Sequence, residues 1–123
     1  MTHEDKELLL KDLCARLPYG VKVESVFINP DTKEHKSCGI EVFDATSILM
    51  IRDGLGEFKP YLFPLSSMTE EQKKEQEAHF TCIKHDMSFS ICRYMEWCYK
   101  NHFDINGLIE KGLAIDATGL NIY

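Results

Sequence analysis

The sequence lacks a long apolar run. Its longest uninterrupted apolar stretch, residues 48–51, is far shorter than the ~20 residues that a membrane-spanning helix requires. The first residues, MTHEDKE, contain acids where a secretory signal carries positive charge, and only three leucines follow them. These two absences predict a cytoplasmic protein that has no membrane partner.

Paired cysteines are lacking too. The chain has five cysteines, which is an odd number, and no two of them have the C-x2-C spacing that anchors a metal. In a chain without an export signal, this favours reduced thiols over a framework of disulfides. We therefore expect the cysteines to serve mostly as small core residues.

Clustered positive charge is also absent. The formal net charge is -6, and the two notable lysine groups, Lys33 with Lys36 and Lys73 with Lys74, stand beside glutamates. Binding to a phosphate backbone draws its affinity from clustered Lys and Arg, so the composition argues against a nucleic-acid partner. The scattered acidic excess is expected to favour solubility.

What the chain does have is the size and composition of one globular domain. It has 123 residues, of which 44% are hydrophobic and 28% are charged, and we expect residues 1–123 to form a single domain. No stretch carries a catalytic or ligand-binding signature. The sequence alone therefore predicts no cofactor and leaves the oligomeric state undefined.

Hydrophobic periodicity predicts an α+β fold. Thr2 and Asp5 approximate the capping box of an N-terminal helix that Pro18 ends. From residue 21 the period changes to two, which predicts a strand up to residue 27, followed by strands at 39–43 and 48–52.

The last predicted strand completes an antiparallel meander of three to four strands. Asp53-Gly54 predicts a hairpin that returns through residues 58–63. Pro60 and Pro64 lack an amide donor, so they place this last strand at the edge of the sheet.

Two dissimilar helices should follow the sheet. Residues 66–80 have good capping signals, such as Thr69 with Gln72, but no apolar side chain between Thr69 and Glu77, which predicts a polar connector helix. Residues 89–100 are apolar round most of a helix, which predicts a buried C-terminal helix. We expect it to pack across the sheet beside the first helix and to shield Trp97.

The sharpest cluster of chemical groups is His79, Cys82 and His85, because imidazole and thiolate are zinc ligands. A regular helix aims the third of these side chains about 240° round from the first, so a zinc site requires a broken helix. Cys82, His85 and Asp86 also supply the residue types of a nucleophilic site, without any known signature around them. Surface histidines beside a half-buried cysteine are the ordinary structural interpretation.

Three stretches resemble a known group of proteins. They are LLLKDLCARLPYGVKV (8–23), KPYLFPLSSMTEEQKKE (59–75) and NHFDINGLIEKGLAIDA (101–117). Together they resemble short uncharacterised proteins of gut Bacteroides species and of the phages and mobile elements that those bacteria carry. The resemblance covers somewhat under half of the chain, and it implies no activity, ligand or catalytic residue.

The functional hypothesis is a small non-enzymatic accessory or adaptor protein, of phage or mobile-element origin, that binds another protein. The polar helix offers a multiply charged surface for that partner, through Glu70, Glu71, Lys73 and Lys74. Exposed ion pairs contribute only ~0 to 1 kcal/mol each, so docking on charges alone would be weak and sensitive to salt. The alternative is a small enzyme or zinc-binding protein that uses His79, Cys82 and His85.

Overall fold

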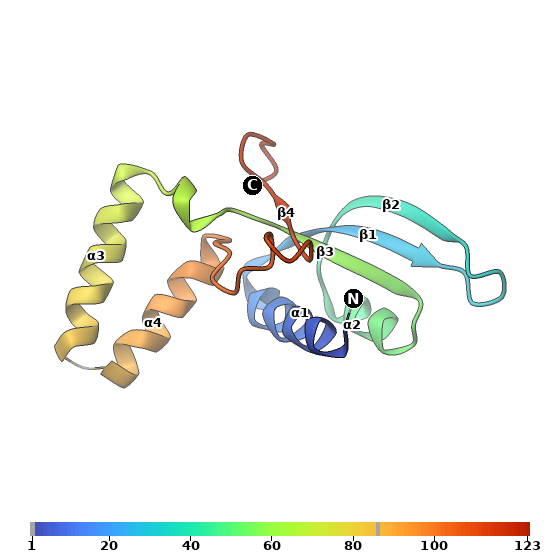
Figure 1. The fold of residues 1–123 in the computed structure, drawn as a ribbon, viewed down its shortest axis with the longest axis horizontal. Helices are drawn as coiled ribbons and strands as arrows, with labels where there is room; N and C mark the ends of the chain where they lie inside the picture. The colour runs from blue at the N-terminus through green and yellow to red at the C-terminus, as the bar shows by residue number, and fades with distance from the viewer. Residues whose placement is uncertain (1, 86) are drawn as a thin grey trace.

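The computed structural model describes residues 2–85 and 87–123, without the side chains of residues 87–89. The chain forms a four-stranded sheet with two helices against one face, and two further helices stand to one side (Figure 1). This confirms the predicted α+β class and the N-terminal helix. The sheet is mixed, because its last strand is parallel to its neighbour.

The first helix, α1 (His3–Arg16), begins where the sequence predicts. The Asp5 amide donates to Thr2 Oγ1 at 3.1 Å, and the Thr2 amide donates to Asp5 Oδ2 at 3.4 Å. These two bonds complete the capping box. A 3-10 turn, η1 (Leu17–Tyr19), follows, and Gly20 ends it with a φ of +67°, which glycine adopts without steric cost.

The strand order is β2-β1-β3-β4, and β1 pairs antiparallel with both of its neighbours. A bulge interrupts the pairing of β1 with β2 after Ser25. The strands are β1 (Lys22–Ile28), β2 (His35–Val42), β3 (Gly56–Leu62) and β4 (Ile115–Asp116).

The predicted strand at 48–52 is wrong, because residues Ala45–Arg52 form a helix, α2. Asp44 caps it: the Ser47 amide donates to Asp44 Oδ1 at 3.0 Å, and the Asp44 amide donates to Ser47 Oγ at 3.3 Å. A short apolar run fits a helix as well as a strand, and this local cap decides between them. Ile48 and Ile51 pack against the core from one side of the helix.

Two predictions that depended on this strand are also wrong. Asp53 and Gly54 follow the end of α2 and lead into β3, so they do not form a hairpin turn. Pro60 is buried in β3, which has β1 on one side and β4 on the other. Pairing with β4 begins only at Tyr61, so the missing amide donor of Pro60 removes no pair of the described β3–β4 ladder.

The core lies between the sheet and the helices α1 and α2 (Figure 1). The opposite face of the sheet carries exposed apolar side chains on β2, where Ile40 and Val42 are more than half exposed. The buried members of the core cluster are Leu9, Leu13, Val21, Val23, Phe43, Phe58, Leu62, Leu108, Leu113 and Ala114.

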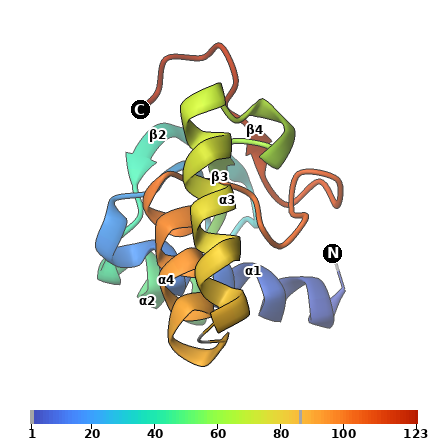
Figure 2. The same ribbon diagram turned by 90° about the vertical axis from the view of Figure 1, so that its left-hand side faces the viewer.

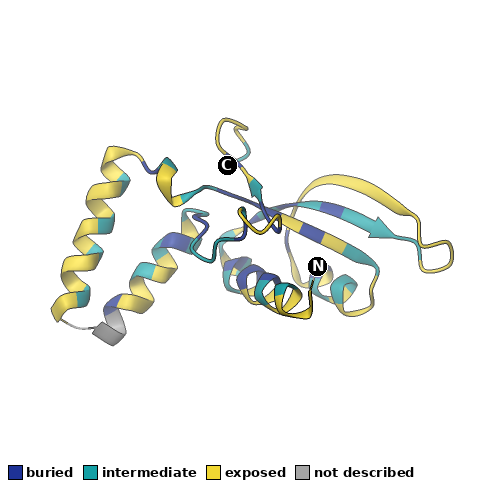
Figure 3. Cartoon of the chain, in the orientation of Figure 1, coloured by how far each residue is buried: buried dark blue, intermediate teal, exposed yellow. Residues whose placement is uncertain are grey.

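The other two helices, α3 (Glu70–His85) and α4 (Met87–Lys100), pack side by side as an antiparallel helical hairpin (Figures 1 and 2). A short 3-10 turn, η2 (Leu65–Ser67), leads from β3 into the hairpin. The hairpin projects from the sheet, and most of its described residues are exposed (Figure 3).

The hairpin corrects the prediction of a connector helix followed by a helix buried on the sheet. α3 is one arm of a helical pair, and α4 packs mainly on α3 instead of across the sheet. Among the described α4 side chains, only Ser90 and Cys98 are buried, and Trp97 is partly buried. An apolar circumference shows how much surface is available for burial, but not what covers it.

The cysteines also differ from the prediction. All five lie within the described residues, and none of them is in a disulfide. Only Cys98 is buried, so the other four are surface residues and not core residues.

The C-terminal segment, residues 101–123, returns from the hairpin to the sheet. It contributes Leu108 and Leu113 to the core and supplies β4. Across residues 2–85 and 87–123, the structure contains no helix with the length and apolar character needed to cross a membrane.

Candidate functional site

Aromatic and polar side chains form the seam between the two helices of the hairpin. Gln76 Nε2 donates to the Tyr94 hydroxyl at 3.0 Å, and Trp97 Nε1 donates to Glu75 Oε2 at 2.6 Å. The His79 ring contacts both Tyr94 and Trp97, with centroid distances of 5.8 and 5.4 Å. Tyr94 and Trp97 present large rings to the seam from α4, so polar side chains of α3 such as Gln76 pack against aromatic surface.

The structure does not bring the three predicted zinc ligands together. α3 is helical as far as His85, so His79, Cys82 and His85 point in different directions round it. No group of three His, Cys, Asp or Glu side chains is arranged to hold a metal ion within the part of the chain that the structure describes. A cavity of about 200 Å³ between α3 and α4 is lined by Ala78, His79, Cys82, Ser90 and Arg93.

The possible nucleophilic set is only partly described. Cys82 and His85 are both exposed near the end of α3. Asp86, its third member, lies outside the described residues, so the geometry of the set is not defined.

The four charged residues predicted to meet a partner lie near the start of α3, and all of them are exposed: Glu70, Glu71, Lys73 and Lys74. Lys73 Nζ lies 3.3 Å from Glu70 Oε1, and the two side chains are 54% and 86% exposed. An ion pair this open to solvent contributes little to folding, so both charges remain accessible to a partner.

The hairpin also exposes large apolar side chains: Phe80 and Ile91 are 38% exposed, and Met95 is 39% exposed. The Phe80 ring lies 5.1 Å from that of Tyr94. Helical rotation places Ile91 and Met95 on the side of Tyr94 away from Trp97, which is the side of Phe80. We call Phe80, Ile91 and Met95 the apolar edge.

Of the four charged residues, Lys73 lies on the same side of α3 as Phe80, because it precedes Phe80 by seven positions. The sequence alone does not predict this edge. The apolar pattern of α4 predicts burial on most sides, and it carries no signal for which side stays open.

A groove of about 380 Å³ lies at the base of the hairpin, where α3 begins and α4 ends. Its wall includes the capping box predicted from sequence, in which the Gln72 amide donates to Thr69 Oγ1 at 3.2 Å. Segments that lie far apart in the sequence form the groove, so no local sequence pattern predicts it. Its lining residues are Phe63, Ser67, Thr69, Gln72, Lys100, Asn101, His102, Phe103 and Tyr123.

His102 has an unusual environment in this groove. Its φ of +62° lies in the left-handed region, which is uncommon for residues other than glycine. The ring stacks on Tyr123 at a centroid distance of 3.7 Å, and no described atom forms a hydrogen bond with its buried Nδ1. Burial, together with the charges of Arg16 and Lys22, lowers the pKa of His102 to about 4. The ring is therefore neutral at pH 7.

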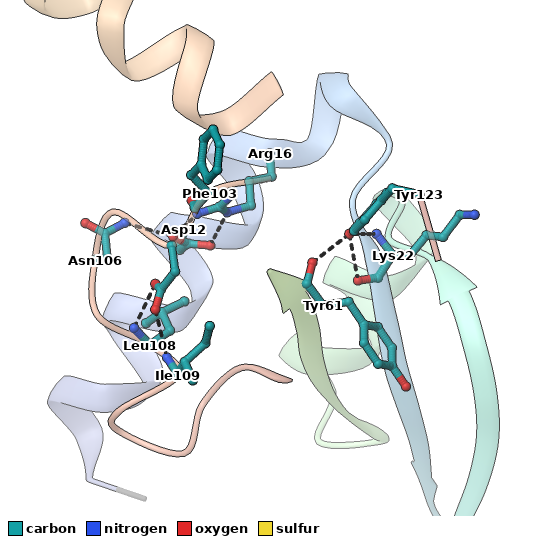
Figure 4. A network of polar contacts seen from close by, with 10 residues as sticks. Asp12, Arg16, Lys22, Tyr61, Phe103, Asn106, Leu108, Ile109 and Tyr123 are labelled. Atoms are coloured by element: carbon teal, nitrogen blue, oxygen red, sulfur yellow. Dashed lines mark hydrogen bonds and ion pairs between the residues drawn. The ribbon is translucent and has the colours of Figure 1, made fainter. Parts of the chain in front are cut away.

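A buried ion pair fixes the start of the C-terminal segment (Figure 4). Arg16 Nε and Nη2 donate to the Asp12 carboxylate at 2.6 and 3.1 Å, and the two residues are 0% and 1% exposed. Arg16 Nη2 also donates to the Phe103 carbonyl at 2.7 Å, and Asn106 Nδ2 donates to Asp12 at 2.8 Å. The guanidinium carbon lies 4.9 Å from the centroid of the Tyr99 ring. The pair thus joins α1 to the end of the hairpin.

Tyr123 holds the tail against β1 and β3 (Figure 4). Its hydroxyl donates to the Tyr61 carbonyl and accepts from the Lys22 amide, both at 2.8 Å. Lys22 Nζ donates to the Ile122 carbonyl at 2.6 Å. Burial raises the pKa of Tyr123 to about 12, so the hydroxyl stays protonated and keeps its donor.

Comparison of the chain with protein-family models, curated proteins and solved structures finds no match. The structure itself offers two candidate functional surfaces. They are the apolar edge with its charged neighbours, and the groove at the base of the hairpin.

Proposed function

We propose that this chain is a non-enzymatic accessory or adaptor protein that binds another protein through the α3–α4 hairpin. The observation that carries the proposal is the apolar edge, because three large apolar side chains are exposed on a part of the chain that projects from the sheet. Contiguous exposed apolar residues with polar neighbours are typical of protein interaction sites.

The chemistry around the apolar edge supports a protein partner. Protein interfaces combine an apolar centre with a polar rim, and Lys73, on the Phe80 side of α3, supplies part of such a rim with its ion-pair partner Glu70. Glu70, Glu71, Lys73 and Lys74 carry both signs of charge, so we expect the partner to present an apolar patch bordered by charges of both signs.

Affinity capture from cells of the native host, or from host cells carrying the mobile element, tests this function. The Ile91→Glu/Met95→Glu variant should lose the protein that the wild type captures. The variant with Glu70, Glu71, Lys73 and Lys74 changed to alanine should bind it more weakly, with a reduced dependence on salt. The Glu110→Ala/Lys111→Ala variant changes exposed residues outside the hairpin and should behave as the wild type does.

Circular dichroism and urea unfolding of each variant separate loss of binding from loss of folding. Equal recovery of the same protein by all variants would refute docking through the hairpin. Recovery of no protein by the wild type would refute the adaptor function itself. If the captured protein is a second copy of this chain, the function is self-assembly and not adaptation.

A further inference from the structure

We propose that the chain forms a homodimer in which β2 pairs antiparallel with β2 of a second copy. β2 is an edge strand of the sheet, and all eight of its residues are exposed. The unpaired backbone groups of an edge strand are a template for a further strand. This contact does not depend on the proposed adaptor function, because the α3–α4 hairpin lies apart from β2 (Figure 1).

The backbone of β2 offers hydrogen-bonding groups to a second copy. The Phe43 amide donates to the Val21 carbonyl at 2.9 Å, next to the pair of Lys22 with Val42. In an antiparallel ladder, hydrogen-bonded pairs alternate with pairs that form no such bonds, so the amides of Val42 and Ile40 point away from β1. They are donors that an additional antiparallel strand needs.

The bulge in the β1–β2 pairing places opposite charges symmetrically on β2. Gly39 pairs with Ser25 of β1, and Lys36 and Glu41 pair with the residues two positions to either side of Ser25. Both charges therefore lie on the same face of the sheet. Without the extra residue that the bulge inserts, a separation of five positions would put them on opposite faces.

This arrangement makes β2 self-complementary. When β2 pairs with its own copy about Gly39, Lys36 of each copy faces Glu41 of the other. Within the described residues, neither side chain has an ion-pair partner in its own chain. Opposite charges directly across an antiparallel pair stabilise it, whereas charges of one sign on an edge strand repel a second copy. Gly39 has no side chain, and open space around it allows the two backbones to approach at the twofold axis.

The other face of the sheet adds apolar contact. Ile40 and Val42 are 55% and 54% exposed. In the same register, Ile40 faces Ser37 of the second copy, and Val42 faces its His35. The second strand thus removes part of both apolar side chains from water, which favours association.

Sedimentation equilibrium of the full chain, between about 1 and 300 μM, tests the proposal. The wild type should dimerise. Lys36→Glu and Glu41→Lys should each weaken dimerisation at least about tenfold, because like charges then face each other across the axis. The Lys36→Glu/Glu41→Lys double variant should dimerise as the wild type does, and an equimolar mixture of the two single variants should form a heterodimer.

Hydrogen exchange of the wild type at about 300 μM locates the contact. The amides of Ile40 and Val42 should exchange at least about tenfold more slowly than in the Lys36→Glu variant, because they donate to the second copy only in the dimer. Equal exchange at these two amides in a dimeric wild type would place the interface elsewhere and overturn the proposal.

Two matched controls separate β2 from other surfaces. Lys111→Glu makes the same change of charge at an exposed residue outside the sheet and should leave dimerisation unchanged. The Ile91→Glu/Met95→Glu variant should also dimerise, so a second copy that it captures as the wild type does is held through β2 and not through the hairpin. A monomeric wild type would overturn the proposal, as would unchanged dimerisation of both single variants, loss of the dimer in either control, or no recovery in the double variant. Circular dichroism confirms that each variant is folded.

Discussion

Among single residues, His102 couples the stability of the fold to pH. Burial lowers its pKa from 6.5 to about 4, and the charges of Arg16 and Lys22 add to that effect. At a pH between these two pKa values, the unfolded chain binds more protons at His102 than the folded chain does. The contribution of the neutral His102 ring to the free energy of unfolding is therefore fully present above pH 6.5 and is lost as the pH falls toward 4. We expect a loss of roughly 1 to 2 kcal/mol, because the partly exposed ring is screened by solvent.

Urea unfolding of the wild type and of the His102→Asn variant, between about pH 7 and pH 4.5, measures this effect. The variant should lose less free energy of unfolding over that range, because Asn does not titrate. If the two pH profiles ran parallel, the His102 ring would not be the titrating group.

The buried pair of Asp12 and Arg16 is the second feature at this scale. Arg16→Met leaves Asp12 buried beside Asn106 without its charged partner, and we expect a loss of about 3 to 5 kcal/mol in the free energy of unfolding. The Asp12→Leu/Arg16→Met double variant removes both charges and should recover much of that loss. Urea denaturation at neutral pH provides the measurement.

Arg52→Met is the matched control, because Arg52 pairs with Asp53 at 3.0 Å while both side chains are largely exposed. It should cost no more than about 1 kcal/mol. Similar losses for Arg16→Met and Arg52→Met would mean that the buried pair does not join α1 to the hairpin in the way that the structure indicates.

Among the elements, α2 depends on its N-terminal cap. Asp44→Ala removes the side chain that accepts from the Ser47 amide, and we expect a loss of about 1 kcal/mol in the free energy of unfolding. Asp53→Ala changes an exposed acid just after the same helix and should cost less. A negligible effect of Asp44→Ala would favour the strand that the apolar run at 48–52 first indicated.

α2 also shows why local patterns define some elements and not others. Thr2 with Asp5 and Thr69 with Gln72 give correct helix starts, because a capping box is a local interaction that the sequence states directly. The run at 48–52 fits both periods, and the cap at Asp44 was the signal that could have decided it. Pro60 does not make β3 an edge strand, because the missing amide donor restricts pairing only at Pro60 and not along the rest of the strand.

At the scale of the whole molecule, the hairpin sets the limits of prediction from sequence. The polar α3 and the apolar α4 were both recognised as helices, but their packing on each other depends on contacts such as Gln76 with Tyr94, which no periodic pattern encodes. The structure shows the charged residues at the start of α3 to be exposed, and their role in binding a partner stays a prediction. The apolar edge and the groove were not predicted, because each of them exists only after distant segments have packed together.

The return of the C-terminal segment to the sheet has a consequence for how the chain folds during synthesis. The β1–β2 and α3–α4 pairs join neighbouring segments, so each can form while the chain is still growing. The core and the Tyr123–Lys22 bond, which spans 101 residues, require residues 101–123, which are synthesised after the segments that they cover. Such long-range closure is slow compared with local pairing, so a ribosome-bound chain lacking residues 101–123 would leave the apolar faces of α1 and the sheet incompletely covered.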